Sequence, residues 1–119
     1  MIFQIPMKLP SLNEYIDVCR GNRYKAAKFK RDVEGAIALF LRFVPKLEKP
    51  VIIHFTWVEE NKRRDYDNIA FAKKFVLDAL VKSGKLKDDN RRFVRGFSDS
   101  FEYADKAKVI LRIEEVNEK

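Results

Sequence analysis

Two aspartates separated by one residue are the side chains in this sequence best suited to chemistry. Asp65 and Asp67 belong to the segment Arg63-Arg64-Asp65-Tyr66-Asp67-Asn68, which lies between a predicted strand and a predicted helix. Carboxylates at this spacing can converge on one hard cation. Mg²⁺ typically takes one or two protein carboxylates together with water and phosphate oxygens. The segment is therefore a candidate magnesium site.

Each of these acids also has a purely structural interpretation. Asp67, or Asn68 beside it, could cap the helix, because the first amides of a helix lack partners. Asp65 could form a surface ion pair with Arg63 or Arg64. Taken singly, these roles suit the spacing better than metal binding does. They do not explain why both acids directly follow a run of consecutive basic residues.

A second acidic pair, Asp88-Asp89, follows Gly84-Lys85-Leu86-Lys87 in a predicted loop. Its spacing alone indicates a polar turn or a cap. A rise of ~1.5 Å per residue separates the two ends of the preceding helix by roughly 24 Å. The loop by itself is then too short a route back to Asp65 and Asp67. We expect the pair to join them only from the next strand or through the sheet.

Lys74 is the candidate cation for such a site. Residues three, four and seven apart return to one face of a helix, so Lys74 can project on the same side as Asp67. The other interpretation is an ion pair with Asp78, four residues further along the helix. The spacing leaves both interpretations open.

The charge balance indicates a polyanionic partner. The 119 residues include 25 Lys and Arg against 18 Asp and Glu, a net charge of +7, and the pI is near 9.6. Such a balance favours nucleic acid. One basic group alone would suit a solvated surface, but three groups favour a phosphate-binding face. They are Arg20, Arg23, Lys25, Lys28, Lys30 and Arg31; Lys62, Arg63 and Arg64; and Lys82, Lys85, Lys87, Arg91, Arg92 and Arg95.

Composition argues against several other classes of protein. The single cysteine, Cys19, excludes an internal disulfide and a cysteine-based zinc cluster, and it suits a reducing cytoplasm. The longest apolar run covers residues 36–41, far short of the ~20 residues of a membrane span. The single histidine, His54, alternates with apolar residues and is more typical of a structural residue than of a metal ligand or a base.

Hydrophobic periodicity predicts a single domain over residues 1–119, of the α/β (α+β) class, with helices packed on one mixed sheet. The predicted order is β-α-β-α-β-β. The elements are a short edge strand in residues 1–9, a turn at Pro10–Asn13, a helix over Lys25–Phe43, a strand over Val51–Val58, a helix over Asp67–Ser83, and strands over Arg92–Phe101 and Lys106–Val116.

These motifs, in this order, resemble the RusA family of Holliday-junction resolvases, the crossover junction endodeoxyribonucleases. The family pattern is a basic run, Asp-x-Asp-Asn, a helix with a Lys, Asp-Ala-Leu, a Gly and Asp-Asp. The matching residues are Arg64-Asp65-Tyr66-Asp67-Asn68, Lys74, Asp78-Ala79-Leu80, Gly84 and Asp88-Asp89. Pro10-Ser11-Leu12-Asn13 is similar to the family's N-terminal Pro-Ser-x-Asn element, so the resemblance spans nearly the whole chain.

The resemblance implies a homodimeric, magnesium-dependent endonuclease that resolves four-way DNA junctions by paired symmetric nicks in DNA recombination and repair. Many members are encoded by phages or prophages. This implies the cytoplasm of a bacterial or phage-infected cell, in association with the nucleoid. By carry-over, Asp65, Asp67 and Asp89 are catalytic acids that bind Mg²⁺, with Mn²⁺ as an alternative ion. Asp88 is a neighbouring ligand that could exchange roles with Asp89.

The lysine of the family pattern matches less directly. Asp67 and Asp78 are eleven residues apart, and the best-known members are about one helical turn shorter. Counting back from Asp-Ala-Leu selects Lys74, whereas counting forward from Asp-x-Asp selects Phe71, which carries no charge. Lys74 is thus taken as the fourth catalytic residue, with Lys73 in reserve.

The resemblance also gives the basic groups a task, which is to bind the junction arms with strongly salt-dependent affinity. The predicted DNA-binding residues are Arg20, Arg23, Lys25, Lys28, Lys62, Arg63, Arg64, Lys85, Lys87, Arg91 and Arg92. Two alternatives are a structure-selective DNA-binding protein without catalysis and an RNA-binding module. The latter would need exposed aromatics such as Tyr24 and Tyr66 to stack bases. The dimer surface and the cleavage preference do not follow from the sequence.

Overall fold

Four strands form one mixed sheet in the computed structural model, which describes residues 1–117. The strand order is β1-β4-β2-β3, with β2 parallel to β3 and antiparallel to β4, and β1 antiparallel to β4. β3 is therefore an edge strand with one paired side. The strands are β1 (Ile2–Ile5), β2 (Val51–Glu59), β3 (Val94–Tyr103) and β4 (Lys108–Glu115). The predicted mixed sheet is confirmed.

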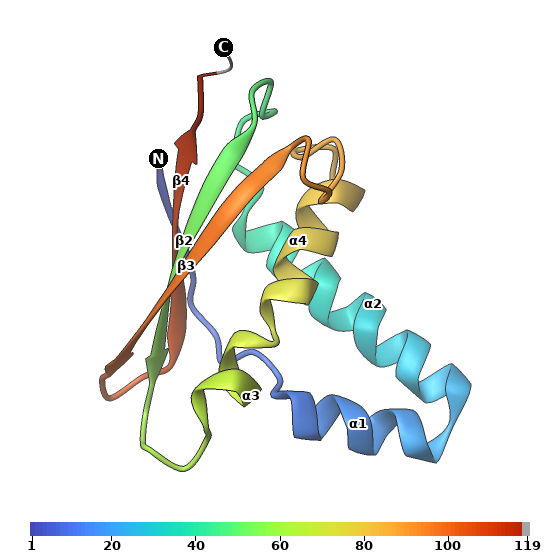
Figure 1. Ribbon diagram of the computed structural model, residues 1–119. Coiled ribbons are helices and arrows are strands. Elements are labelled where there is room, and N and C mark those ends of the chain that lie inside the picture. The colour runs from blue at the N-terminus through green and yellow to red at the C-terminus, as the bar shows by residue number, and fades with distance from the viewer. Residues whose placement is uncertain (118–119) are drawn as a thin grey trace.

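The helices lie on one face of this sheet (Figure 1). They are α1 (Leu12–Gly21), α2 (Arg23–Phe40), α3 (Tyr66–Ala70) and α4 (Lys73–Lys82). α2 and α4 pack against each other, and α1 lies at the far end of α2 beside α3. The expected α+β class, with helices packed on a sheet, is thus confirmed. No helix within residues 1–117 has the length and apolarity to cross a bilayer.

Alternation along β2 decides which face of the sheet is buried. Ile53, Phe55 and Trp57 point toward the helices and join the hydrophobic core, which also contains residues of α2 and α4. His54 points to the other face. Its Nδ1 lies 2.6 Å from the Ser98 hydroxyl and its Nε2 lies 3.0 Å from a Glu114 carboxylate oxygen. The single histidine is thus held by neighbouring strands of the sheet.

The predicted turn at Pro10–Asn13 is wrong, because α1 begins there. Ser11 caps this helix: its Oγ accepts a hydrogen bond from the Glu14 amide at 3.2 Å, and its hydroxyl donates to the Glu14 carboxylate at 3.3 Å. The first of these bonds is a side-chain N-cap, which satisfies one of the amides that the first turn leaves without a partner. Hydrophobic periodicity did not predict α1, because no residue of this helix is fully buried. Asn22 then ends α1 and caps α2, accepting from the Tyr24 amide at 2.7 Å.

The predicted helix Asp67–Ser83 is also corrected, since it is broken at Phe71 and Ala72 into α3 and α4. Around the break, amides bond to carbonyls three residues back rather than four, as in Ala72 to Ile69 and Lys74 to Phe71. Such bonds tighten the helix and change its course. The observed order is therefore β-α-α-β-α-α-β-β, and Asp67 and Lys74 do not share one continuous helical face.

The Ser11 N-cap generates a first prediction. Replacing Ser11 by alanine should lower the free energy of unfolding by about 1 kcal/mol, because the first turn of α1 loses a hydrogen-bond acceptor. Urea unfolding followed by circular dichroism measures the change. Asn13→Ala is the matched control, an exposed substitution in the same turn, expected to stay within about 0.5 kcal/mol of the parent. Equal losses in the two variants would contradict the capping role.

Candidate active site

Asp65 and Asp67 lie at the start of α3, and both side chains are exposed. Asp65 occupies the N-cap position, yet it makes no capping hydrogen bond through its side chain. Within residues 1–117, neither carboxylate forms a hydrogen bond or an ion pair. The structure thus shows neither the cap at Asp67 nor the surface ion pair at Asp65 that the sequence allowed. The oxygen atoms of both carboxylates are therefore available to bind a cation.

Arg64, which the sequence allowed as an ion-pair partner of Asp65, has other partners in the structure. Its guanidinium donates to the Glu59 carboxylate at 3.0 Å and to the Leu9 carbonyl at 3.0 Å. The two side chains of this ion pair are only 14% and 9% exposed. Arg64 therefore connects three parts of the chain: Glu59 at the end of β2, Leu9 in the segment before α1, and the start of the candidate site. Its guanidinium is turned inward, unlike the exposed arginines of the predicted DNA-binding set.

Lys74 lies between two acids. Its ammonium is 3.2 Å from the Asp78 carboxylate and 3.5 Å from the Asp89 carboxylate. The pKa of Lys74 is raised above its ordinary value, chiefly by the hydrogen bond to Asp78, with the charge of Asp89 adding to the effect and partial burial opposing it. Lys74 is therefore a permanent cation at neutral pH. The ion pair that the sequence allowed with Asp78 is confirmed.

The loop that follows α4 carries Asp89, whose carboxylate meets the long side chain of Lys74. Within this loop Asp88 has an internal task, since its carboxylate accepts from the Asp89 amide at 2.7 Å and from the Asn90 side chain at 3.2 Å. Asp89 is the acid that reaches Lys74. The two neighbouring acids are therefore not equivalent, and the geometry favours Asp89 as the functional one.

The third acid does not join the first two. Among residues 1–117, no group of three or more His, Cys, Asp and Glu side chains is placed to hold a metal ion. In Figure 1, α3 and the loop after α4 lie at opposite ends of α4. The structure thus contains two local arrangements, the pair Asp65 and Asp67 and the pair Lys74 and Asp89, rather than one three-acid cluster.

Lys73 points away from Lys74 and toward the sheet. Its ammonium is 2.8 Å from the Asp99 carboxylate of β3 and 4.7 Å from the centre of the Phe97 ring. Asp99 also accepts a hydrogen bond from the indole of Trp57 at 2.9 Å. Sequence reasoning missed Asp99, because nothing in the local pattern of β3 indicates partners on α4 and β2. Lys73 is therefore a packing residue, whereas Lys74 is 56% exposed.

Comparison with known proteins agrees with the family resemblance that the sequence motifs indicate. The family model described as Endodeoxyribonuclease RusA matches residues 8–114. The chain belongs to the RusA family. The resemblance stated from the motifs is confirmed, and membership implies, at the level of the family, endonuclease action that resolves Holliday junctions. No protein of curated function matches the sequence.

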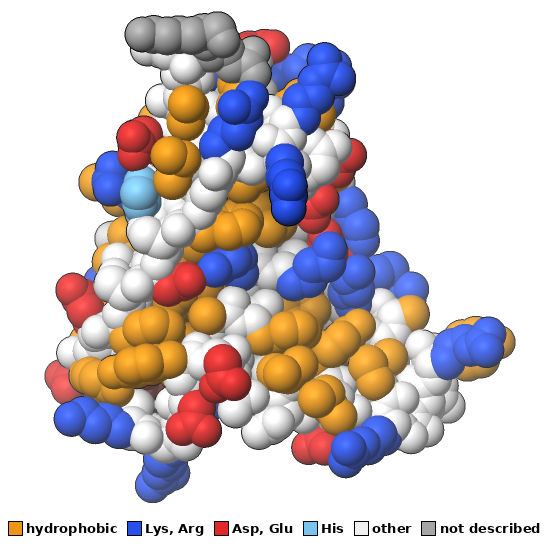
Figure 2. Space-filling model, viewed as in Figure 1, with side chains coloured by type: hydrophobic (Ala, Val, Ile, Leu, Met, Phe, Trp, Pro, Cys, Tyr) orange, Lys and Arg blue, Asp and Glu red, His pale blue; other side chains and the backbone are white. Residues whose placement is uncertain are grey.

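The basic residues expected to contact DNA in a RusA protein lie mostly on the surface. Figure 2 shows Lys and Arg side chains along the helices and around the loop after α4, with acidic side chains between them. Lys28 and Lys85 have protein partners, the Asp32 carboxylate at 2.7 Å and the Arg42 carbonyl at 3.0 Å. The exposed members of the predicted set are Arg20, Arg23, Lys25, Lys28, Lys62, Arg63, Lys87, Arg91 and Arg92.

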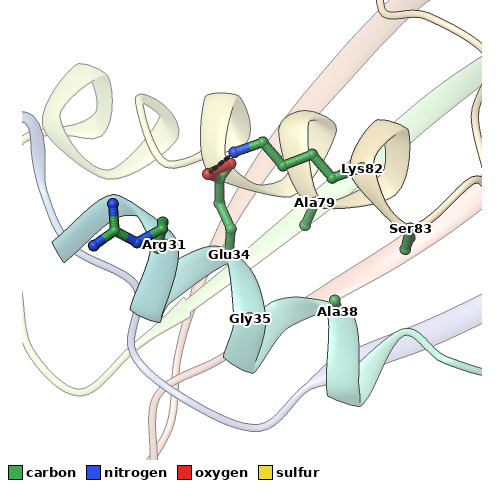
Figure 3. Close-up of a pocket in the computed structure, with 7 residues that line it drawn as sticks. All are labelled: Arg31, Glu34, Gly35, Ala38, Ala79, Lys82 and Ser83. Atoms are coloured by element: carbon green, nitrogen blue, oxygen red, sulfur yellow. Dashed lines mark hydrogen bonds and ion pairs between the residues drawn. The ribbon is translucent and has the colours of Figure 1, made fainter. Parts of the chain in front are cut away.

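A cavity of about 350 Å³ between α2 and α4 is separate from the candidate site (Figure 3). Glu34 points into this region with its carboxylate buried, and the Lys82 ammonium lies 2.8 Å from it. Lys30 and Asp78 form a second ion pair between the two helices at 3.2 Å. None of the predicted metal-binding acids lines the cavity. The candidate site therefore lies outside this cavity, and Asp65 and Asp67 are on an exposed part of the surface.

The inward position of Arg64 generates a prediction on stability. Arg64→Ala should lower the free energy of unfolding by about 3–5 kcal/mol, because Glu59 would keep a buried carboxylate without its counter-charge. Arg63→Ala, at the adjacent exposed position, is the control and should change that free energy by less than about 0.5 kcal/mol. Urea denaturation of both variants decides the point. Two equally stable variants would show that the Arg64 ion pair is dispensable.

Proposed function

We propose that this protein is a magnesium-dependent, structure-selective endonuclease that resolves four-way DNA junctions by paired symmetric nicks. The observation that carries the proposal is the pair of exposed carboxylates, Asp65 and Asp67, which have no side-chain partner among residues 1–117 in a chain of the RusA family. Its proposed place is DNA recombination and repair in the cytoplasm of a bacterial or phage-infected cell, where four-way DNA is accessible.

The chemistry of the donor set supports a divalent cation at this position. Two unpartnered carboxylates, one residue apart, match the number of protein ligands that Mg²⁺ commonly takes, with water and phosphate oxygens completing its shell. When bound, Mg²⁺ or Mn²⁺ would supply a more acidic water and neutralise charge on the phosphate. Asp65 and Asp67 would hold the ion, and the phosphate of the DNA would bind beside them.

Lys74 and Asp89 form the second part of the proposed site. Lys74 would stabilise negative charge that develops on the phosphate, an electrostatic task that needs a permanently protonated amine. Its raised pKa and its exposure suit that task. Asp89 keeps Lys74 oriented through the 3.5 Å contact. The RusA pattern also makes Asp89 the third metal-binding acid of the proposal, and in the described residues this acid lies beside Lys74.

Binding of the junction arms would rest on the exposed lysines and arginines. Each contact to a DNA phosphate releases counterions, so the affinity should fall steeply with salt concentration. A two-fold symmetric homodimer would present two copies of the site to opposed strands and thereby explain paired cuts.

A second candidate function is structure-selective DNA binding without cleavage. The observation in its favour is that the described residues contain no group of three acidic or histidine side chains placed to hold a metal. This function needs the basic surface but neither Asp65 nor Asp67. Metal-dependent nicking separates the two candidates.

The decisive experiment is cleavage of a labelled synthetic four-way junction with and without Mg²⁺. Wild-type protein should give paired nicks, and Asp65→Asn and Asp67→Asn should each reduce the rate by at least ~100-fold while retaining junction affinity. Glu48→Gln, at an exposed position just before β2 and at the opposite end of that strand from Glu59, is the control and should cleave normally. Tight binding by the wild type without nicks in Mg²⁺ or Mn²⁺ would establish the non-catalytic function instead.

The two adjacent lysines should separate in their effects. Lys74→Ala should slow single-turnover cleavage by ~10²- to 10³-fold with little change in thermal stability, because an exposed cation near the phosphate is lost. Lys73→Ala should instead lower the melting temperature, because Asp99 loses its partner in the core-facing layer. Cleavage kinetics and thermal unfolding of both variants test this assignment. A slow Lys73→Ala enzyme of normal stability beside a fast Lys74→Ala enzyme would reverse it.

A further inference from the structure

Tyr66, the residue between the two proposed metal-binding acids, is held in a fixed orientation by another aromatic ring. Its ring is stacked on that of Phe101 of β3, with centroids 4.0 Å apart and planes inclined by 16°. Tyr66 nevertheless remains 56% exposed. Because Phe101 covers one face of the tyrosine ring, the exposed area comes from the opposite face and the edge.

This open ring is part of a small aromatic surface at the edge of the sheet, which comprises Tyr66, Phe101 and Tyr103. Tyr103 is 42% exposed, and the Lys62 ammonium lies 5.4 Å from the centre of its ring. The surface thus offers aromatic rings with a cation over one of them, and its Tyr66 is flanked in the sequence by Asp65 and Asp67. Figure 2 shows hydrophobic side chains gathered over this end of the sheet, next to acidic side chains.

The chemistry of this surface matches a nucleotide better than a protein partner. A nucleobase supplies a flat face that stacks on tyrosine, and its phosphate supplies an anion that Lys62 can contact. The aromatic surface is narrow and interrupted by charge, whereas an interface between proteins has an apolar core from which charged residues are depleted. Asp65 and Asp67 flank Tyr66 in the sequence, so a base stacked on Tyr66 would lie near both acids.

We propose that Tyr66, supported by Phe101, stacks on an unpaired or unstacked nucleobase and thereby positions the adjoining phosphate beside Asp65 and Asp67. The inference rests on the proposed nuclease function. It explains how the nuclease would distinguish branched or single-stranded DNA from an intact duplex. In an intact duplex both faces of each base are already stacked, so Tyr66 has nothing to bind. At a branch point, or in a single strand, a base face becomes available at a lower cost in stacking energy. Tyr66 is thus a positioning residue.

Binding to uncut DNA tests the proposal. The base analogue 2-aminopurine is placed in turn at each position flanking the branch point of a four-way junction, and Asp67→Asn protein is used so that the DNA stays intact. Stacking on Tyr66 should change the fluorescence at one of these positions. Tyr66→Leu, which keeps an apolar contact with Phe101, should abolish that change and weaken junction binding by ~10-fold, with duplex affinity unaltered. Tyr66→Phe should retain both properties.

Phe43→Ala is the matched control. Phe43 is 77% exposed and has the Arg42 guanidinium 4.6 Å from its ring centre, so it reproduces an aromatic–cation pair away from the proposed site. It should leave fluorescence and affinity unchanged. Tyr66→Leu protein that matches its parent in both measurements would overturn the stacking proposal even if the wild type cleaves junctions. Conversely, a Tyr66-dependent signal from a wild type that never nicks DNA would uphold base stacking and refute the nuclease function.

Discussion

The buried ion pair between Arg64 and Glu59 is the interaction on which the candidate site depends. Removing two charges from water is costly, and here the cost is offset by mutual attraction and by a further hydrogen bond from Arg64 to the Leu9 carbonyl. The pair joins β2, the segment before α1 and the residue that precedes Asp65. It also engages an arginine that the sequence allowed as an ion-pair partner of Asp65. Within residues 1–117 the Asp65 carboxylate forms no ion pair.

A similar division of charge occurs at the start of α4. Lys73 and Lys74 are adjacent in sequence but project in different directions, one to Asp99 beneath the aromatic side chains of the sheet and the other to Asp89 on the surface. The tightened backbone at Phe71 and Ala72 sets this arrangement, since it begins α4 on a new course after α3. One lysine then contributes to packing, and the other stays exposed and protonated near the proposed site.

The sequence predicted those features whose cause is local. β2 follows from β-branched and aromatic residues that alternate between two faces, and Asp65 and Asp67 stand out because acids interrupt a basic run. The break between α3 and α4 was not predictable in this way. Phe71 contacts Tyr15, with ring centres 5.7 Å apart, so the break coincides with packing against a helix more than fifty residues away. The role of Arg64 depends likewise on Leu9, a partner that periodicity does not reveal.

The exposure of Asp65 and Asp67 limits the size of the substrate that the candidate site can bind. The cavity between α2 and α4 is small and largely apolar, and its buried acid, Glu34, already has Lys82 as a partner. A small molecule would need such an enclosure to displace water from most of its surface. The acids Asp65 and Asp67 instead lie on an exposed part of the fold, where only a large ligand can exclude solvent. A DNA strand is large enough to cover the acids and exclude solvent. Its phosphates also bring oxygen ligands in addition to those of the two carboxylates.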